Sequence, residues 1–487
     1  MAKLNISGLT FAYDGGENLF ENVSLQIDSR WKLGLIGRNG RGKTTFLRLL
    51  MGELKCNGDI SVPIPVDYFP CNVGDPAQLT REIIEKTTEC EPWQLYRELS
   101  LLEISEDVLD RPFETLSGGE RTKILLAALF LNENRFLLID EPTNHLDLQG
   151  RKTVADYLNG KSGFILVSHD RTLLDHCVDH IISINRSDIE LIQGNFSTWQ
   201  QTRENRDRFE ESENNKLRRD IKRLEESRKR SADWSGRAER EKYGNGPVDR
   251  GFLGSKAARM MSRAKTADSR RQRAADEKSN LFKNVEIEDK LTLKSFDFHS
   301  KCLVDLSDIT VQYQARNPLF ENFSLSINTA DRLALCGRNG CGKSSLLKLI
   351  AGEHVPHTGI CRIPSALKIS YVPQDTSFLR GTLRKLIEQR DLDESFFKSI
   401  LHKLGVGREH FETDLSDFSE GQKKKVLLAA SVCDHAHLYL WDEPLNYVDV
   451  ISRIQIEEML VESKATIVFI EHDQRFLDNV ATKIIEL

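Results

Sequence analysis

The most informative segment of the chain is Gly37-Arg38-Asn39-Gly40-Arg41-Gly42-Lys43-Thr44-Thr45, which is repeated as Gly337-Arg338-Asn339-Gly340-Cys341-Gly342-Lys343-Ser344-Ser345. Each copy follows an apolar run, at 32–36 and 332–336, and precedes a helix-like run. The pattern GxxxxGK[ST] in that context predicts a loop whose backbone N–H groups bind phosphates. We expect Lys43 and Lys343 to reach the outer phosphates, and Thr44 and Ser344 to bind Mg²⁺. A plain glycine-rich turn is the alternative, but it does not explain why the motif occurs twice in the same setting.

The chain is an internal duplication. Phe20-Glu21-Asn22 returns as Phe320-Glu321-Asn322, and Tyr13 returns as Tyr313, all with the same offset of 300 residues. A repeat of this length indicates duplicated domains rather than a solenoid, and 487 residues are too many for one hydrophobic core. We therefore expect domains at 1–198 and 286–487 and a connector at 199–285.

The apolar pattern predicts an α/β fold in each domain. Nearly continuous apolar runs at 136–139, 164–167, 438–441 and 467–470 are typical of central parallel strands covered on both faces. Alternating residues at 3–6 and 303–306 predict an opening strand in each copy. The expected architecture is two P-loop domains joined by a long α-helical hairpin.

Paired acidic residues follow two of these strands. Asp140 and Asp442 end their runs and suit the magnesium side of a phosphate site. Glu141 and Glu443 come next, and they suit a group that orients and polarises an attacking water. Acidic capping of the following turn is the alternative.

Two histidines also occupy matched positions. His169 and His472 each follow a further apolar strand. A single histidine would be uninformative, but two at equivalent positions predict a contact with the terminal phosphate.

Composition narrows the class of protein. Apolar residues make up 39% and charged residues 29% of the chain, and it contains no apolar run of 18 residues. The N-terminus lacks the apolar core of an export signal. The nine cysteines are scattered without a CxxC pair, which argues against a disulfide framework, a zinc site or an iron–sulfur site. We expect a cytoplasmic protein with reduced thiols and no membrane segment.

Charge is concentrated in the middle of the chain. Residues 216–273 contain 19 Lys and Arg against 8 Asp and Glu, a net +11, while the whole chain carries −6. The remainder therefore carries −17. A basic segment between two acidic domains predicts a polyanionic partner for the connector.

Leu116-Ser117-Gly118-Gly119-Glu120 resembles the signature of the ABC ATPase superfamily, with a degenerate second copy in Phe418-Ser419-Glu420-Gly421-Gln422. The resemblance implies that ATP is held between the P-loop of one domain and the signature of the other. One site then pairs residues 37–44 with 419–422, and the other pairs 337–344 with 117–120. It also implies a functional monomer whose two domains pair within the chain. Because the second signature departs from the pattern, we expect the first of these sites to be slower.

Further family positions carry over. The resemblance implies that Tyr13 and Tyr313 stack on adenine, with exposed strand tyrosines as the alternative. Gln374 matches the Q-loop glutamine that helps to ligate Mg²⁺, and its counterpart is Cys71, which puts the first Q-loop in doubt. Residues 144–147 and 446–449 match the D-loops, the second imperfectly.

The connector discriminates between classes of ABC protein. Apolar stripes, such as Leu217, Ile221 and Leu224, predict two antiparallel helices joined by an irregular tip. A solvated spacer or a disordered charged linker is the alternative. DNA-repair ABC ATPases interrupt a single domain with a far longer coil, and a transporter ATPase needs a membrane partner. Two complete domains around a basic hairpin resemble the ABC-F family of translation factors.

Within that family, the chain resembles the antibiotic-resistance group of the Lsa and Vga type. The residues that carry this resemblance are Trp234-Ser235 and Asp249-Arg250-Gly251-Phe252-Leu253-Gly254-Ser255-Lys256-Ala257-Ala258-Arg259-Met260-Met261. The resemblance implies that residues 199–285 enter the 70S ribosome from the tRNA exit site and meet rRNA and P-site tRNA, with the tip from Tyr243 to Leu253. It implies protection against lincosamides, pleuromutilins and group A streptogramins. A housekeeping ABC-F translation factor is the alternative, and a transporter subunit is a more distant one.

Overall fold

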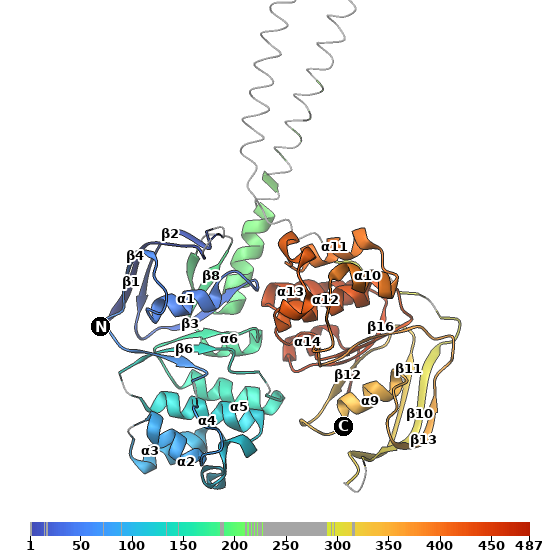
Figure 1. The fold of residues 1–487 in the computed structure, drawn as a ribbon. Helices are drawn as coiled ribbons and strands as arrows, with labels where there is room; N and C mark the ends of the chain where they lie inside the picture. The colour runs from blue at the N-terminus through green and yellow to red at the C-terminus, as the bar shows by residue number, and fades with distance from the viewer. Residues whose placement is uncertain are drawn as a thin grey trace, which may run out of the picture. The chain divides into compact units, whose positions relative to one another are not determined.

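The computed structural model describes residues 2–209 and 290–487, except for 14, 16–17, 72, 89, 133, 145, 186–188, 294, 297 and 314–316, together with positions 212, 213, 216, 219, 222 and 226. The chain divides into two compact units, one formed by Met1–Trp199 with Asp289–Leu487 and the other by Gln200–Glu288. The first unit contains both copies of the repeated domain, drawn from blue to green and from yellow to red in Figure 1.

Each copy contains a largely parallel sheet, and the α/β prediction is confirmed. The order in the first copy is β5-β6-β7-β3-β8-β9, in which β9 is antiparallel to β8. The order in the second copy is β14-β15-β16-β12-β17, with parallel pairs throughout. The strands of the first sheet are β3 Lys32–Gly37, β5 Val66–Phe69, β6 Phe136–Asp140, β7 Phe164–Val167, β8 His180–Ile184 and β9 Ile189–Gln193. The strands of the second sheet are β12 Arg332–Cys336, β14 Ile369–Val372, β15 Leu438–Asp442, β16 Thr466–Ile470 and β17 Lys483–Glu486.

A three-stranded antiparallel sheet opens each copy. Its order is β2-β1-β4 in the first copy and β11-β10-β13 in the second. The strands are β1 Lys3–Phe11, β2 Phe20–Asp28, β4 Asn57–Ser61, β10 Cys302–Val311, β11 Phe320–Asn328 and β13 His357–Arg362. Both of the predicted opening strands are therefore present.

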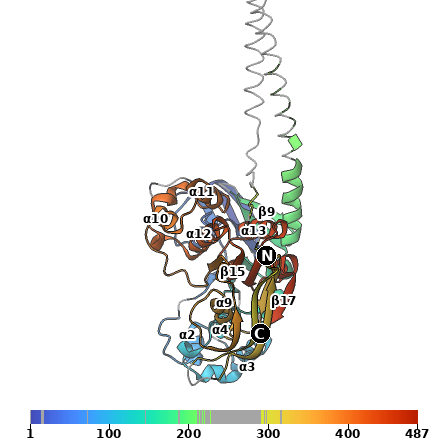
Figure 2. The same cartoon turned by 90° about the vertical axis from the view of Figure 1, so that its right-hand side faces the viewer.

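Helices cover the parallel sheets. The first copy contributes α1 Lys43–Leu50, α2 Thr80–Thr87, α3 Pro92–Leu101, α4 Gly118–Leu131, α5 Leu148–Asn159 and α6 Arg171–Cys177. The second contributes α9 Lys343–Ile350, α10 Leu383–Arg390, α11 Glu394–Lys403, α12 Glu420–Cys433, α13 Val450–Glu462 and α14 Gln474–Val480. In both views, α10, α11 and α12 lie side by side (Figures 1 and 2).

Burial on both faces explains the continuous apolar runs. Phe136 and Leu138 pack into one core with β1, β2 and α1, whereas Leu137 and Ile139 pack into another core with α4 and α5. Successive side chains of a strand point to opposite faces, so a strand between two cores needs apolar residues at every position. Each such side chain contributes about 1.5–3 kcal/mol when fully buried.

The sheet also gathers the predicted site residues at one edge. In parallel strands the carboxyl ends lie together, and the loops that follow them build the site. In the first copy, β3, β6 and β7 lie next to one another and lead into the P-loop, into Asp140-Glu141 and into His169. In the second copy, β12, β15 and β16 do the same.

Of the second unit, the described residues are helical. The helical stretch 196–209 crosses from the first unit into it, and Arg203–Asp207 and Glu204–Arg208 are ion pairs one turn apart. The predicted stripes and the tip from Tyr243 to Leu253 lie outside the described residues. Among the residues that are described, no helix is both long and apolar enough to cross a membrane.

Candidate functional site

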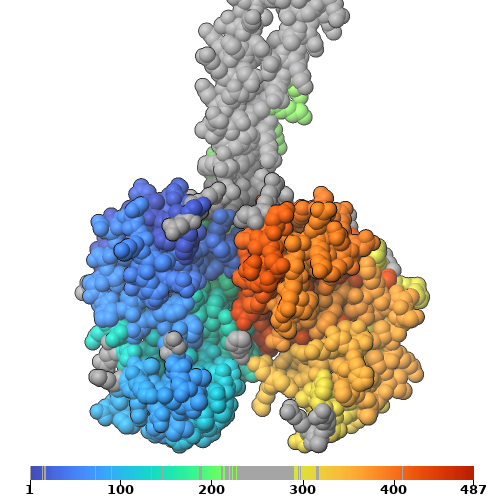
Figure 3. Space-filling model, in the orientation of Figure 1, coloured from blue at the N-terminus to red at the C-terminus, as the bar shows by residue number. Residues whose placement is uncertain are grey.

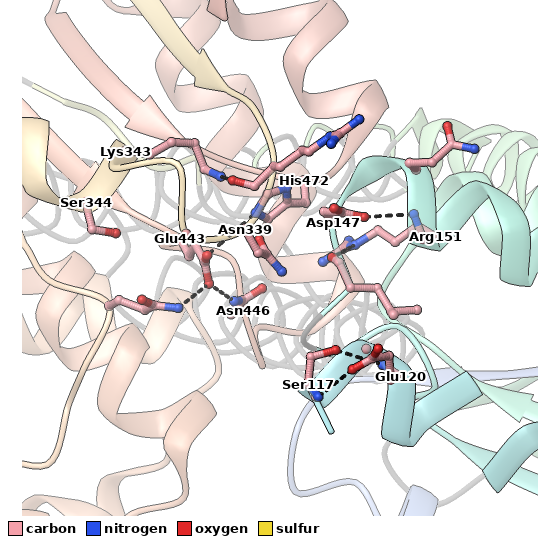
Figure 4. Close-up of a pocket in the computed structure, with 18 of the residues that line it drawn as sticks. Ser117, Glu120, Asp147, Arg151, Asn339, Lys343, Ser344, Glu443, Asn446 and His472 are labelled. Carbon is pink, nitrogen blue, oxygen red and sulfur yellow. Dashed lines mark hydrogen bonds and ion pairs between the residues drawn. The ribbon is translucent and has the colours of Figure 1, made fainter. Parts of the chain in front are cut away.

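A cavity of 1370 Å³ is lined by residues from both copies. The second copy contributes its P-loop, Gln374, Glu443 and His472, and the first contributes its signature from Ser117 to Glu120. Figure 4 shows the P-loop side and the signature side facing each other across this space. Atoms of the two copies also meet on the face drawn in Figure 3. The cavity therefore contains the residues expected for one of the two composite sites.

Both P-loops have the geometry of a phosphate cradle. Gly42 and Gly342 precede α1 and α9 with φ of 89° and 106°, in the left-handed region that favours glycine. A Cβ on Gly42 would lie 2.5 Å from Leu19 Cδ2, so the close approach also requires glycine. Lys43 Nζ donates to Gly37 O and Lys343 Nζ donates to Gly337 O, both at 2.8 Å. Burial lowers the pKa of Lys43, an ammonium enclosed by its own loop.

The carboxylates that end the central strands lie beside the P-loop hydroxyls. Thr44 Oγ1 donates to Asp140 Oδ2 at 3.3 Å, and Tyr68 Oη donates to the same oxygen at 3.0 Å. In the second copy, Ser344 is hydrogen-bonded to Asp442, and burial raises the pKa of that carboxyl to about 6. Asp442 Oδ1 is one of the buried atoms, within the described part of the chain, that have no hydrogen-bond partner.

This donor set fits Mg²⁺. The groups are hydroxyl and carboxylate oxygens, which are the ligands this ion prefers. The unpartnered oxygen of Asp442 is available to the ion or to one of its waters. Thr44 with Asp140, and Ser344 with Asp442, would hold the ion in the two copies.

Glu141 and Glu443 adopt a backbone conformation that is rare for glutamate. Their φ values are 51° and 47°, and their N–H groups donate to Val167 O at 2.8 Å and Ile470 O at 3.1 Å. Non-glycine residues in this region cost about 1–3 kcal/mol and cluster at functional sites. The same strained turn in both copies aims each carboxylate at the histidine of the neighbouring strand.

The two glutamates differ in their surroundings. His169 Nε2 lies 3.4 Å from Glu141 Oε1, and His472 Nε2 lies 3.6 Å from Glu443 Oε1. Burial, reinforced by Asp140, raises the pKa of Glu141 to about 8. Burial opposes ionisation of Glu443 as well, but the neighbouring His472 and the hydrogen bond from Gln374 hold its pKa below the ordinary value.

The Q-loops account for part of this difference. Gln374 Nε2 donates to Glu443 Oε2 at 2.8 Å. At the equivalent position, Cys71 is half-buried and packs against the helical core of the first copy. Because a thiol cannot act as an amide donor, the first copy lacks the hydrogen bond that Gln374 supplies.

The two tyrosines proposed for adenine lie beside the P-loop helices. Tyr13 Oη is 3.0 Å from Thr45 Oγ1, and Tyr313 Oη donates to Ser345 Oγ at 3.2 Å. Their side chains remain 51% and 38% exposed. Exposed rings beside the phosphate loop have a free face for a base.

Each signature forms a helix N-terminus. Ser117 caps α4 and exchanges hydrogen bonds with Glu120, and Ser419 caps α12 and does the same with Gln422. Gly118 and Gly119 form the first turn of α4. The degenerate signature therefore keeps the capping box and with it a regular helix start.

The first P-loop lies against the second copy. Asn39 Nδ2 donates to Tyr447 O at 2.8 Å, and Asn39 N donates to Asp449 Oδ2 at 3.3 Å. A Cβ on Gly421 would lie 2.6 Å from Asn39 Nδ2. Arg38 Nη1 donates to Lys403 O at 3.2 Å. Both predicted head-to-tail pairs are thus brought together, one around the cavity and the other in direct contact.

The remaining predicted positions belong to the same loops. In the first P-loop, Gly40 has φ of 80° and Arg41 N donates to Arg38 O; in the second, Gly340 has φ of 82° and Cys341 N donates to Arg338 O. Arg338 and Asn339 line the cavity. Gln422 Nε2 also lies 3.3 Å from His410 Nε2.

Several contacting residues were not predicted. One of them is Tyr68, which donates a hydrogen bond to Asp140, and another is Lys424, which is buried beside Gln374. Neither was assigned a role from the motifs. The run Lys423-Lys424-Lys425 inside an otherwise apolar helix is a signal that could have directed attention to Lys424. Tyr68 gives no such signal, because a tyrosine at the end of a strand is common.

Comparison with known proteins gives one family and several relatives that match nearly the whole of this chain. The family model described as ABC transporter matches residues 20–144 and 320–446. Putative ATP-binding protein YdiF of Bacillus subtilis is 26% identical and covers 100% of this chain and 80% of its own. Ribosome protection protein VmlR of the same species is 28% identical, with coverages of 95% and 82%, and ATP-binding protein Uup of Caulobacter vibrioides is 28% identical, with 97% and 75%.

A solved structure shares the fold. The complex of archaeal ribosomal stalk protein aP1 and archaeal ribosome recycling factor aABCE1 contains a chain that matches with a TM-score of 0.65 and 22% identity. The match covers 98% of this chain and 87% of that one.

Proposed function

The chain belongs to the ABC transporter family and is an ATPase, and from that premise we propose that it is a ribosome-binding protein of the ABC-F group with two ATP sites between its own domains. One observation carries the enzymatic part of this proposal. A single cavity joins the second P-loop, Glu443 and His472 to the signature around Ser117. These are the groups that a composite ATP site requires on its two sides.

Each residue has a defined role in hydrolysis. Lys343 binds the outer phosphates in place of its present bond to Gly337 O, and the N-terminus of α4 presents N–H groups and Ser117 to the terminal phosphate. Glu443 accepts a hydrogen bond from water and aligns it for attack on the terminal phosphorus, while His472 orients Glu443 and contacts the same phosphate. Lys43, Glu141 and His169 repeat these roles in the first site.

Mg²⁺ neutralises negative charge on the phosphates when it is bound. Ser344, Asp442 and Gln374 are the residues of the second copy that would hold it. Thr44 and Asp140 are those of the first copy, which has Cys71 in place of the glutamine.

The two sites are unequal in this proposal. The site of residues 337–344 has the complete signature, and its own copy supplies Gln374. The site of residues 37–44 has Cys71 and the altered signature of Ser419, Gly421 and Gln422. We therefore assign faster turnover to the site that contains Lys343.

The charge of the connector indicates which partner the protein binds. Its basic segment, residues 216–273, carries a net charge of +11 between acidic domains and suits the phosphates of rRNA and tRNA, which basic residues bind without reading sequence. VmlR, whose name describes ribosome protection, is similar over nearly the whole chain. We assign residues 199–285 to the tRNA exit side of the 70S ribosome, close to P-site tRNA. This places the protein in the cytoplasm.

Protection against lincosamides, pleuromutilins and group A streptogramins is the preferred physiological role. The apolar pair Phe252-Leu253 between two glycines supports a tip that contacts an RNA loop near the drug site. A housekeeping role in translation is the second candidate. It is supported by YdiF and Uup, which match at the same level of identity and are named only as ATP-binding proteins.

Ribosome pelleting with ATP tests the partner. Replacing Glu141 and Glu443 together by glutamine leaves the P-loops intact and removes the water-orienting carboxylates. The double variant should bind ATP, hydrolyse it at a small fraction of the wild-type rate and remain on 70S ribosomes. Binding should fall steeply with added salt, because cations of the connector displace counterions from RNA. Wild-type turnover in this variant would overturn the catalytic assignment, and absence from the ribosome pellet would overturn the partner.

Growth of a drug-sensitive bacterium separates the two roles. Expression of the wild-type chain should raise tolerance to at least one of the three drug classes and leave sensitivity to aminoglycosides unchanged. Phe252→Ala with Leu253→Ala should reduce that tolerance while ATP hydrolysis is retained. Ribosome binding without any gain in tolerance would leave the housekeeping role.

A further inference from the structure

Among the positions at which the second signature helix differs from the first, two lie one turn apart on the same side. Glu420 stands where α4 has Gly118, and Lys424 stands where α4 has Thr122. Residues four apart on a helix are neighbours on the same side. Both side chains contact the segment around Gln374, so the two differences from α4 affect the same loop.

Glu420 holds the loop beyond the glutamine. Thr376 Oγ1 donates a hydrogen bond to Glu420 Oε2, and Lys423 Nζ lies 3.1 Å from Glu420 Oε1. Thr376 is 1% exposed, so its hydroxyl exchanges little with water. The hydrogen bond from Thr376 lowers the pKa of Glu420, which keeps the acceptor ionised at neutral pH.

Lys424 connects the backbone just before Gln374 to the backbone just before Glu443. The side chains of Gln374 and Glu443 are themselves hydrogen-bonded to each other. Lys424 Nζ donates to Pro373 O at 2.8 Å and to Asp442 O at 3.2 Å. These carbonyls directly precede Gln374 and Glu443 in the chain, and Gln374 Nε2 donates to Glu443 Oε2 at 2.8 Å. The ammonium therefore fixes the spacing between the strand end and the Q-loop.

Burying the ammonium group of Lys424 costs free energy. Lys424 is 2% exposed, and burial lowers its pKa. A buried ammonium needs compensation by hydrogen bonds or opposite charge. Its compensation comes from the two carbonyls and from the nearby carboxylates of Asp442, Glu471 and Glu443.

The first copy lacks every part of this arrangement. Val73 and Gly118 occupy the positions of Thr376 and Glu420, so neither hydroxyl nor carboxylate is present. Thr122 Oγ1 donates to Gly118 O at 3.0 Å, a bond within its own helix. Cys71 replaces the glutamine itself. The clamp and the glutamine thus occur together in the second copy and are missing together in the first.

We propose that Glu420 and Lys424 are positioning residues that clamp the second Q-loop and hold Gln374 on Glu443. On this proposal, the two residues that differ in the second signature helix, Glu420 and Lys424, help to position Glu443 of their own copy. Because the same signature lies against the first P-loop, α12 contacts elements of both ATP sites. This inference rests on the roles proposed above for Gln374 and Glu443.

A double-mutant cycle in the full-length chain tests the clamp. Lys424→Thr introduces the residue of the first copy, and Gln374→Ala removes the amide that the clamp positions. Each should lower kcat for ATP about tenfold, the loss expected for one hydrogen bond to a charged group. KM for ATP should change less than kcat. In the Gln374→Ala background, Lys424→Thr should change kcat by less than about twofold.

Two further variants make the result decisive. Lys398→Thr removes an exposed lysine of α11 that pairs with Glu394 and should leave kcat and the unfolding midpoint unchanged. Thr376→Val, again the residue of the first copy, should reproduce part of the loss in kcat without removing a buried charge. If Lys424→Thr does not fold, the Thr376→Val variant tests the clamp instead.

The outcomes are separable. Losses from Lys424→Thr and Gln374→Ala that multiply would overturn the clamp, because the lysine would then act independently of the amide. A Thr376→Val variant with wild-type kcat would overturn it as well. If Gln374→Ala alone leaves kcat unchanged, the role proposed for Gln374 fails instead.

Discussion

At the scale of single residues, the two glutamates proposed to act in catalysis share a backbone conformation but not an electrostatic environment. Glu443 receives hydrogen bonds from Gln374 and Asn446. Glu141 is buried next to Asp140, whose carboxylate is already bonded by Tyr68. Two glutamates at equivalent positions can therefore differ in orientation and in protonation state, because neighbouring groups set the hydrogen bonds and the pKa of each carboxylate.

Single substitutions should reveal this inequality. Glu443→Gln should remove most of the steady-state ATPase activity, about tenfold or more, because the site with the complete signature loses its water-orienting group. Glu141→Gln should cause a smaller loss in the same assay, and it serves as the matched control. Both variants should keep the affinity of the wild type for ATP, measured by equilibrium binding. The opposite order of the two losses would assign faster turnover to the site that contains Lys43.

At the scale of elements, the signature helices show how a changed motif keeps its shape. In α4, Ser117 N donates to Glu120 Oε2 at 2.7 Å, and Glu120 N donates to Ser117 Oγ at 3.2 Å. In α12, Gln422 replaces the glutamate, and the two bonds measure 3.0 Å and 3.3 Å. A neutral amide thus forms the same capping box as a carboxylate.

This comparison predicts unequal effects on stability. Ser117→Ala removes the side-chain acceptor of the cap and should lower the free energy of unfolding by about 1 kcal/mol. Glu120→Gln copies the second signature and should keep the free energy within about 0.5 kcal/mol of the wild type. Urea unfolding followed by circular dichroism measures both. Equal destabilisation by the two variants would show that the charge, rather than the cap, stabilises the start of α4.

At the scale of the whole molecule, an asymmetric ion network links the two copies of the ATPase domain. Arg171 Nη2 lies 2.6 Å from Glu457 Oε2 and 3.5 Å from Asp473 Oδ2, and Arg453 Nη1 lies 3.5 Å from that same oxygen. Arg171 follows His169 by two residues, and Asp473 directly follows His472. The counterpart of Arg171 in the second copy is Gln474, and there the next residue, Arg475, pairs with Asp175 of the first copy instead.

Removing Arg171 should loosen the pairing of the copies. Arg171→Met would leave Glu457 and Asp473 with less positive charge around them in a buried setting, at a cost of about 3 kcal/mol. Thermal unfolding should show a lower midpoint or a separate early transition. Gln474→Met is the matched control, because Gln474 Nε2 bonds the exposed Asp478 within its own helix. An Arg171→Met protein with the wild-type midpoint would show that the network contributes little.

The secondary-structure elements and the chemistry of the loops can be predicted from the sequence alone. The motif around Lys43 and Lys343 requires a strand before it and a helix after it, and both are present. The continuous apolar run from Phe136 to Ile139 predicted a strand between two cores. These features could be predicted because each depends on neighbours in the chain: the period of side chains along a strand, the conformational freedom of glycine, and the caps of a helix.

Which side chains of distant segments meet depends on how the chain packs in three dimensions. Thr376 and Glu420 are 44 residues apart, and Arg171 and Asp473 are 302 apart. A threonine, a glutamate or an arginine at these positions has no periodicity and reads as an ordinary surface residue. Its partner is fixed by how the sheets and helices pack, because hydrogen bonds and ion pairs need atoms within a few ångströms and burial to exclude water. The clamp on Gln374 and the link between the copies therefore exist only in the folded chain.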